Sequence, residues 1–182
     1  MTPAARLQAA IEILDEVIAS ARDDGPPADV IVTRYFKQRR YAGSGDRRAA
    51  RELVFRAIRH TSHRPETGRS AILGLAENEP KMLNLFGQPR GPEAPAPNEP
   101  AAQPGIVPEW LRSELSPLIS EAEWPALLDR APLDLRVNAA RTSRDELLGE
   151  FPGAEKTPVS PWGIRLPPDS KVDSGSTPNF DV

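Results

Sequence analysis

The most distinctive group of chemically active side chains in this chain is a cluster of cations. Eleven of its twenty-three Lys and Arg residues fall between residues 34 and 69, where only three acidic residues accompany them. This stretch, called here the basic segment, carries about +8, whereas the whole 182-residue chain has a formal charge of −3. A local excess of positive charge within an acidic chain predicts a polyanionic partner, most simply nucleic acid.

Arginine outnumbers lysine ten to one in the basic segment. The planar guanidinium group suits bidentate contacts to phosphate and stacking on unpaired bases, so RNA is the favoured partner. The alternative is a solvated helix surface whose arginines form intramolecular ion pairs. RNA is preferred because three local acids cannot neutralise eleven cations. The expected RNA-binding residues lie around one glycine-containing turn: Arg34, Lys37, Arg39, Arg40, Arg47, Arg48 and Arg51.

Other kinds of chemistry find little support in the sequence. The chain has no cysteine, which excludes disulfides, thiolate metal sites and cysteine nucleophiles. His60 and His63 have no carboxylate cluster beside them, so we expect helix capping or RNA contact rather than metal binding. The Gly43–Gly45 turn matches no phosphate-binding loop and is expected only to join two helices. We therefore predict no catalytic residue, no metal ligand and no cofactor-binding residue.

Hydrophobic periodicity predicts helices around this turn. Thr2 and Pro3 begin a helix whose apolar positions recur at helical spacing, at Leu7, Ile11, Leu14 and Ile18. Further helices are expected over residues 27–39, 46–60, 68–76 and 80–86, with Ile58 on the apolar face of the third helix. Residues 30–32 could instead form a short strand. We expect the tryptophans to be packing anchors, with base stacking left open for the last of them: Trp110, Trp124 and Trp162.

Composition divides the chain into four parts. Residues 87–105 contain six prolines and three glycines and are expected to be an extended linker at a domain boundary. Before it, residues 1–86 form a helical RNA-binding domain. After it, residues 106–167 form a small α/β subdomain, in which Leu133, Leu135 and Val137 alternate with polar residues as in a strand. Residues 168–182 are expected to be a disordered tail. The predicted fold class is α+β.

Three phrases of the sequence resemble bacterial ribosomal RNA cytosine-C5 methyltransferases of the Sun/Fmu (NOL1/NOP2/Sun) family. They are RAPLDLRVN at residues 130–138, the P-x-W-L pattern at 108–111, and YFKQRRYAGSGDRR at 35–48. The resemblance covers residues 3–167. It implies that residues 1–86 are similar to the antitermination factor NusB and bind RNA, expected to be small-subunit ribosomal RNA. It also implies that residues 106–167 resemble the RNA-recognition subdomain that precedes the catalytic core.

The resemblance stops before the catalytic chemistry of that family. Its members hold S-adenosylmethionine in a Rossmann-like domain and attack cytosine with a cysteine, and this chain has neither the glycine-rich turn nor a cysteine. We therefore expect an N-terminal part of such an enzyme, natural or produced by a frameshifted or truncated gene, that binds RNA but cannot methylate it alone and binds no cofactor. The alternatives are a free-standing NusB-like RNA-binding or antitermination module and a protein-interaction domain.

The location expected for the chain is the cytoplasm. Its N-terminal residues do not form a signal peptide, and no apolar run approaches the length needed to cross a membrane. No membrane partner is therefore expected. The sequence leaves the oligomeric state open.

Overall fold

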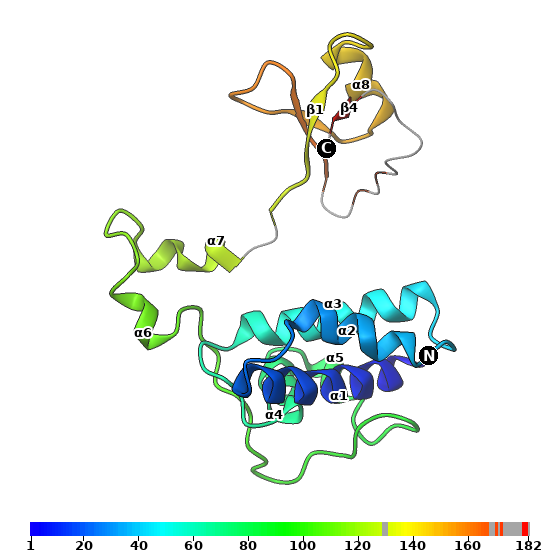
Figure 1. Ribbon diagram of the computed structural model, residues 1–182, viewed down its shortest axis with the longest axis vertical. Coiled ribbons are helices and arrows are strands. Elements are labelled where there is room, and N and C mark those ends of the chain that lie inside the picture. The colour runs from blue at the N-terminus through cyan, green and yellow to red at the C-terminus, as the bar shows by residue number, and fades with distance from the viewer. Residues whose placement is uncertain (129–130, 168–169, 171, 173–179, 182) are drawn as a thin grey trace. The chain divides into compact units, whose positions relative to one another are not determined.

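The computed structural model describes residues 1–128, 131–167, 170, 172 and 180–181, and the chain divides into two compact units, residues 1–128 and 129–182. The protein is rich in helix and has a small antiparallel sheet, which confirms the α+β class at this level. The elements, shown in Figure 1, are α1 (Pro3–Arg22), α2 (Ala28–Lys37), α3 (Ser44–His60), α4 (Gly68–Ala76), α5 (Pro80–Leu83), α6 (Glu109–Arg112), η1 (Glu121–Glu123), α7 (Trp124–Leu128), β1 (Asp134–Val137), α8 (Arg144–Glu150), β2 (Glu155–Lys156), β3 (Gly163–Arg165) and β4 (Phe180–Asp181).

Helix α1 is the centre of the N-terminal unit, where it packs against α2, α3 and α4 (Figure 1). It begins as predicted, with Pro3 in its first turn and the Thr2 hydroxyl accepting a hydrogen bond from the Ala5 amide at 3.1 Å. The predicted apolar face is buried, and Ile13 is fully buried as well. The buried face is broader than the sequence spacing predicts because three helices cover α1.

Helices α2 and α3 bring the basic segment to the surface of this core. Residues 30–32 lie within α2, so the alternative of a strand is wrong. Tyr35 and Phe36 of α2 are buried in the core. Helix α3 packs through small side chains, with Ala50 and Ala57 fully buried, whereas Ile58 is 38% exposed rather than internal. The apolar stripe of α3 is therefore narrow, and its other faces are left for charged residues.

Residues 87–105 do not behave as the predicted linker. The Ala102 amide donates to the Ser70 carbonyl oxygen at 2.9 Å, and the Gly105 amide donates to the His60 carbonyl oxygen at 2.9 Å. A proline-rich chain can dock in this way because its non-proline residues keep their amide donors. The two units separate after Leu128, so the expected boundary at 87–105 is wrong and α6, η1 and α7 belong to the N-terminal unit.

Arg69 and Gly74 of α4 hold this docked segment. The Arg69 guanidinium group forms an ion pair with Glu99 and donates to the Glu93 carbonyl oxygen at 3.0 Å. The hydrogen bond from Arg69 lowers the pKa of the Glu99 carboxyl below its ordinary value. Gly74 lies so close to the segment that a Cβ atom there would overlap the carbonyl oxygen of Ala102. Helix α4 thus needs glycine at this position for the segment to approach.

The second unit is built on an antiparallel sheet with the strand order β2-β3-β1-β4. Leu135 of β1 lies opposite Ile164 of β3, and Asp134 is paired with Arg165 across the same two strands through two contacts of 2.8 Å. The predicted alternation is confirmed for Leu135 and Val137, which are buried, but Leu133 precedes β1 and is 40% exposed. The core of this unit contains residues from both strands, from α8 and from the residue after β3: Leu135, Val137, Leu147, Ile164 and Leu166.

The predicted disordered tail lies largely outside the described residues. Of residues 168–182, the structure describes only 170, 172 and 180–181. The last pair forms β4, which is antiparallel to β1. The prediction of disorder is therefore wrong for residues 180 and 181.

Replacing Gly74 with alanine should test whether the 87–105 segment is docked. We expect Gly74→Ala to lower the free energy of unfolding by about 1–3 kcal/mol, the usual cost of overpacking, and to speed proteolysis within residues 87–105. The measurements are urea denaturation and limited proteolysis.

Gly45→Ala is the matched control, because a Cβ atom at residue 45 of α3 would meet nothing within 4 Å. It should leave proteolysis unchanged and alter stability by no more than about 1 kcal/mol, in the stabilising direction. Equal proteolysis of the two variants would show that Gly74 does not position the segment.

Candidate nucleic-acid interface

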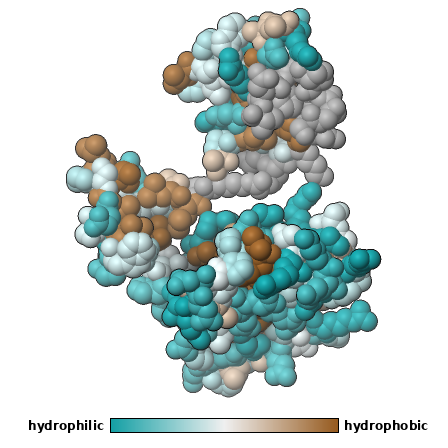
Figure 2. All heavy atoms as spheres, in the orientation of Figure 1, coloured by the Kyte–Doolittle hydropathy of each residue, from teal (hydrophilic) through white to brown (hydrophobic). Residues whose placement is uncertain are grey.

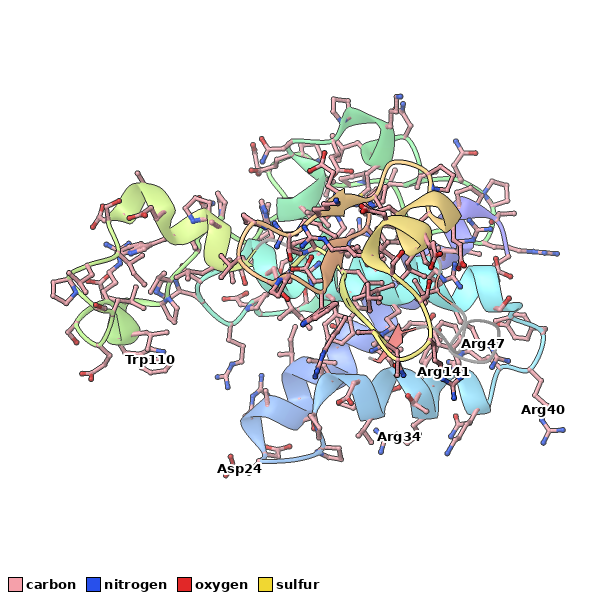
Figure 3. All side chains as sticks on the ribbon, turned by 90° about the horizontal axis from the view of Figure 1, so that it is seen from above. Asp24, Arg34, Arg40, Arg47, Trp110 and Arg141 are labelled. Carbon is pink, nitrogen blue, oxygen red and sulfur yellow. The ribbon has the colours of Figure 1, made fainter. Side chains whose placement is uncertain are left out.

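The seven predicted RNA-binding residues lie on α2, on α3 and on the turn between them. Six of them are exposed, and Arg39 is half-buried. The turn is short, residues 38–43, so the end of α2 and the start of α3 are held close together. Figure 3 shows Arg34 on α2 and Arg40 at the turn, with the Arg40 side chain extending away from the ribbon. The fold therefore gathers the predicted residues on adjoining elements.

Two of the seven residues are engaged by acids of α1. Arg34 Nη2 lies 3.2 Å from Glu16 Oε2, and Arg39 Nη2 lies 3.3 Å from Glu12 Oε2. The guanidinium carbon of Arg39 also lies 3.5 Å from the centre of the Tyr35 ring, in a cation–π contact. These arginines help to fix α2 on α1, and they are less available to an external anion than their exposure indicates.

Acids from outside the basic segment neutralise part of its charge. Besides Glu12 and Glu16 of α1, Glu79 pairs with Arg56 and Glu99 pairs with Arg69. Only three acids lie within the basic segment itself, and the fold supplies four more from outside it. The alternative interpretation therefore holds in part, because some of the arginines form intramolecular ion pairs.

The remaining cations define what we call the basic corner: Lys37, Arg40, Arg47, Arg48 and Arg51. Lys37, Arg40 and Arg48 form no ion pair with any residue that the structure describes. Arg47 donates from Nε to the Ala42 carbonyl oxygen at 2.9 Å and so braces the turn. The guanidinium carbon of Arg51 lies 5.4 Å from the centre of the Phe55 ring. Five exposed cations thus surround one turn.

Asp46 fixes the basic corner to α1. Its carboxylate accepts hydrogen bonds from the Met1 α-amino group at 2.9 Å, from Arg6 Nε at 2.9 Å and from the Gly43 amide at 3.2 Å. The bond from the amino group, with those from Arg6 and Gly43, lowers the pKa of Asp46 to about 2. The acid at the start of α3 is therefore neutralised locally and does little to repel a phosphate at the corner.

A hydrogen-bonded cluster of polar side chains around Glu12 lies beside the basic corner, and sequence reasoning missed it. The Tyr35 hydroxyl donates to Glu12 Oε2 at 2.5 Å, and Gln8 Nε2 donates to Glu12 Oε1 at 3.2 Å. Burial first, and then the hydrogen bond to and the charge of Glu12, raise the pKa of Tyr35 far above its ordinary value. Glu12 sits on a helix whose periodicity marks only apolar positions, and its partner Tyr35 is 23 residues away.

The remaining features considered in the sequence are the histidines, metal binding and membrane crossing. Among the described residues, no three His, Asp or Glu side chains are placed to hold a metal ion. His63 is exposed, with Nδ1 3.0 Å from the Ser62 hydroxyl oxygen, and the His60 carbonyl group binds the docked segment. Within the same described parts, no helix is long and apolar enough to cross a membrane.

Two of the three tryptophans differ from the expectation that they are packing anchors, whereas Trp124 is half-buried, with the centre of its ring 5.6 Å from the guanidinium carbon of Arg112. Trp110 is 74% exposed and Trp162 is 46% exposed, so neither is a buried anchor. Leu118 and Leu127 are also exposed, and Figure 2 shows hydrophobic surface over the part of the chain that contains α6 and α7. These helices are too short to turn all of their apolar residues toward one core.

Replacing Asp46 with asparagine should change how stability depends on pH. Because the folded-state pKa of Asp46 lies below its unfolded value, its carboxylate stabilises the fold above about pH 4, and this contribution is lost as the pH falls toward about 2. Asp46→Asn should therefore lower Tm near neutral pH, and the difference from wild type should vanish near pH 2. Thermal denaturation followed by circular dichroism measures this.

Asp23→Asn provides the control, because Asp23 is exposed and has no ion-pair partner among the residues described. Its Tm difference from wild type should be small at every pH. A pH-independent difference for Asp46→Asn would mean that the carboxylate charge does not stabilise the corner.

Comparison with known proteins found no relative that could be set beside this geometry. No protein-family model matches the chain, and neither a curated protein nor a solved structure matches it. The resemblance to the Sun/Fmu family therefore stays a prediction from three phrases of the sequence.

Proposed function

We propose that this protein binds RNA through the basic corner formed by the end of α2, the 38–43 turn and the start of α3. The observation that supports this most strongly is that three exposed cations at one turn have no ion-pair partner in the described parts of the chain: Lys37, Arg40 and Arg48. Four other arginines of the basic segment are paired with acids: Arg34, Arg39, Arg56 and Arg69. Exposed cations left together at one turn repel one another unless an anion approaches.

Arginine and the neighbouring aromatic residue favour RNA over other polyanions. Three or more guanidinium groups at one turn can bind phosphates in bidentate fashion, and they can also stack on bases that are unpaired. Tyr41 adds an aromatic ring that is 73% exposed between Arg40 and the start of α3. Such a ring offers a surface on which an unpaired base can stack.

The finer proposal is that residues 1–86 form a NusB-like RNA-binding domain of a ribosomal RNA cytosine-C5 methyltransferase. The YFKQRRYAGSGDRR phrase on which the resemblance depends contains four of the five residues of the basic corner. The RNA would then be small-subunit ribosomal RNA, and the protein would act in the cytoplasm. Since the chain has no cysteine, the proposal for these residues is limited to binding.

Charge reversal at the corner tests the proposal. Lys37, Arg40 and Arg48 changed together to Glu should weaken binding to a fluorescently labelled RNA stem–loop at least about 10²-fold. For the wild type, about five phosphate contacts should weaken binding about 10²-fold between roughly 50 and 200 mM salt, and the triple variant should show a shallower salt dependence. Fluorescence anisotropy titrations measure both quantities.

A matched variant carries the same change of charge elsewhere on the N-terminal unit. Arg22, Arg64 and Lys81 are exposed and lie outside the basic corner, so their joint replacement by Glu should change RNA affinity far less. Equal loss in both variants would show that net charge alone drives binding and that the corner is not the site. If polyglutamate competed as well as RNA, an acidic protein would be the better candidate partner.

A further inference from the structure

A cavity of about 600 Å³ lies beside the basic corner, within the range typical of small-ligand sites, about 300–1,000 Å³. Helix α1 forms one wall, and α2, the 38–43 turn and the docked 87–105 segment form the others. Its polar and aromatic lining residues are Gln8, Glu12, Tyr35, Arg39, Tyr41 and Arg90. No residue of the basic corner lines the cavity itself, but Tyr41 is the residue after Arg40 and so brings the cavity next to the same turn. Apart from Arg39, these lining residues are absent from the predicted RNA-binding set.

One side of the cavity is a rigid polar network around Glu12. Its two carboxylate oxygens accept hydrogen bonds from Gln8, Tyr35 and Arg39. The negative charge is thereby compensated within the protein, so it does little to repel a nucleotide phosphate. The network also orients the Gln8 amide, a group of the type that hydrogen-bonds to the edges of unpaired bases.

Tyr41 and Arg90 line the cavity without such a network. Tyr41 is 73% exposed, although covering a large aromatic ring is energetically favourable. Arg90 is exposed, has a left-handed backbone conformation with φ of 65°, and forms no ion pair with the residues that are described. An uncovered ring and an unpaired cation are complementary to a base and to its phosphate.

We propose that this cavity binds one unpaired nucleotide of the RNA that the basic corner holds, with its base stacked on Tyr41 and its phosphate paired with Arg90. This inference rests on the proposed RNA-binding function and goes beyond it, because it makes the protein selective for RNA with an unpaired nucleotide. The corner supplies affinity through phosphates, and the cavity supplies the preference for an unpaired base.

The test compares two RNA duplexes that differ only by a single bulged 2-aminopurine, a fluorescent purine. The wild-type protein should bind the bulged duplex at least about tenfold more tightly than the fully paired one, the effect of one base–aromatic stack. The 2-aminopurine fluorescence should change on binding as the base leaves water. Tyr41→Ala should lose this preference, so that its affinities for the two duplexes become equal.

Tyr41→Phe keeps the stacking ring and should retain the preference for the bulge. Both Tyr41 variants should fold normally because the side chain is mostly exposed, and circular dichroism checks this. Adenosine monophosphate should bind far more weakly than the bulged duplex, since it lacks the contacts to the corner. If it bound equally tightly, a free nucleotide rather than RNA would be the ligand and the proposal would fail.

The outcomes separate this inference from the proposed function. Equal affinity of the wild type for the two duplexes, with salt-dependent binding intact, would overturn the nucleotide cavity and leave RNA binding in place. A bulge preference that survives in Tyr41→Ala would also overturn it. If neither duplex bound at all, both proposals would be wrong.

Discussion

The packing of α1 against three other helices is the constraint on which the N-terminal unit depends. The three acids of α1 lie on the side of the helix that its core face leaves open, and each has a partner on another element although Asp15 and Glu16 are exposed. Glu12 binds Tyr35 and Arg39, Glu16 binds Arg34, and Asp15 Oδ1 accepts a hydrogen bond from the Gly68 amide at the start of α4. The acids of α1 thereby engage two of the arginines that the sequence assigned to RNA, Arg34 and Arg39.

Much of the secondary structure could be predicted because it depends on local signals. The spacing of Leu7, Ile11, Leu14 and Ile18 and the cap at Thr2 predicted α1, and residues 68–76 form the expected helix. The 87–105 segment could not be predicted in this way. Its attachment depends on the fit of Ala102 against Gly74 and on the pairing of Arg69 with Glu99, contacts between residues about 30 positions apart that composition does not encode.

The candidate site was predictable to a similar extent and for similar reasons. The sequence showed where cations are dense and that a turn would bring Arg40, Arg47 and Arg48 together. It could not show that Arg34 and Arg39 would be paired, since their partners lie 18 and 27 residues away on α1. Tyr41 offered the one signal for the cavity that could have been used, an aromatic residue within an arginine-rich turn.

The carboxylate of Glu12 has a further consequence for how Arg39 responds to ligands. It is tethered to the same chain as the arginine it binds, so it competes with any phosphate at a high effective concentration that dilution does not lower. An RNA phosphate would have to displace this internal competitor before it could use Arg39, whereas Arg40, the next residue, requires no displacement. Arg39 and Arg40 have the same chemistry but differ in their availability to a phosphate. For Arg39, a phosphate must bind more strongly than the internal carboxylate of Glu12 does.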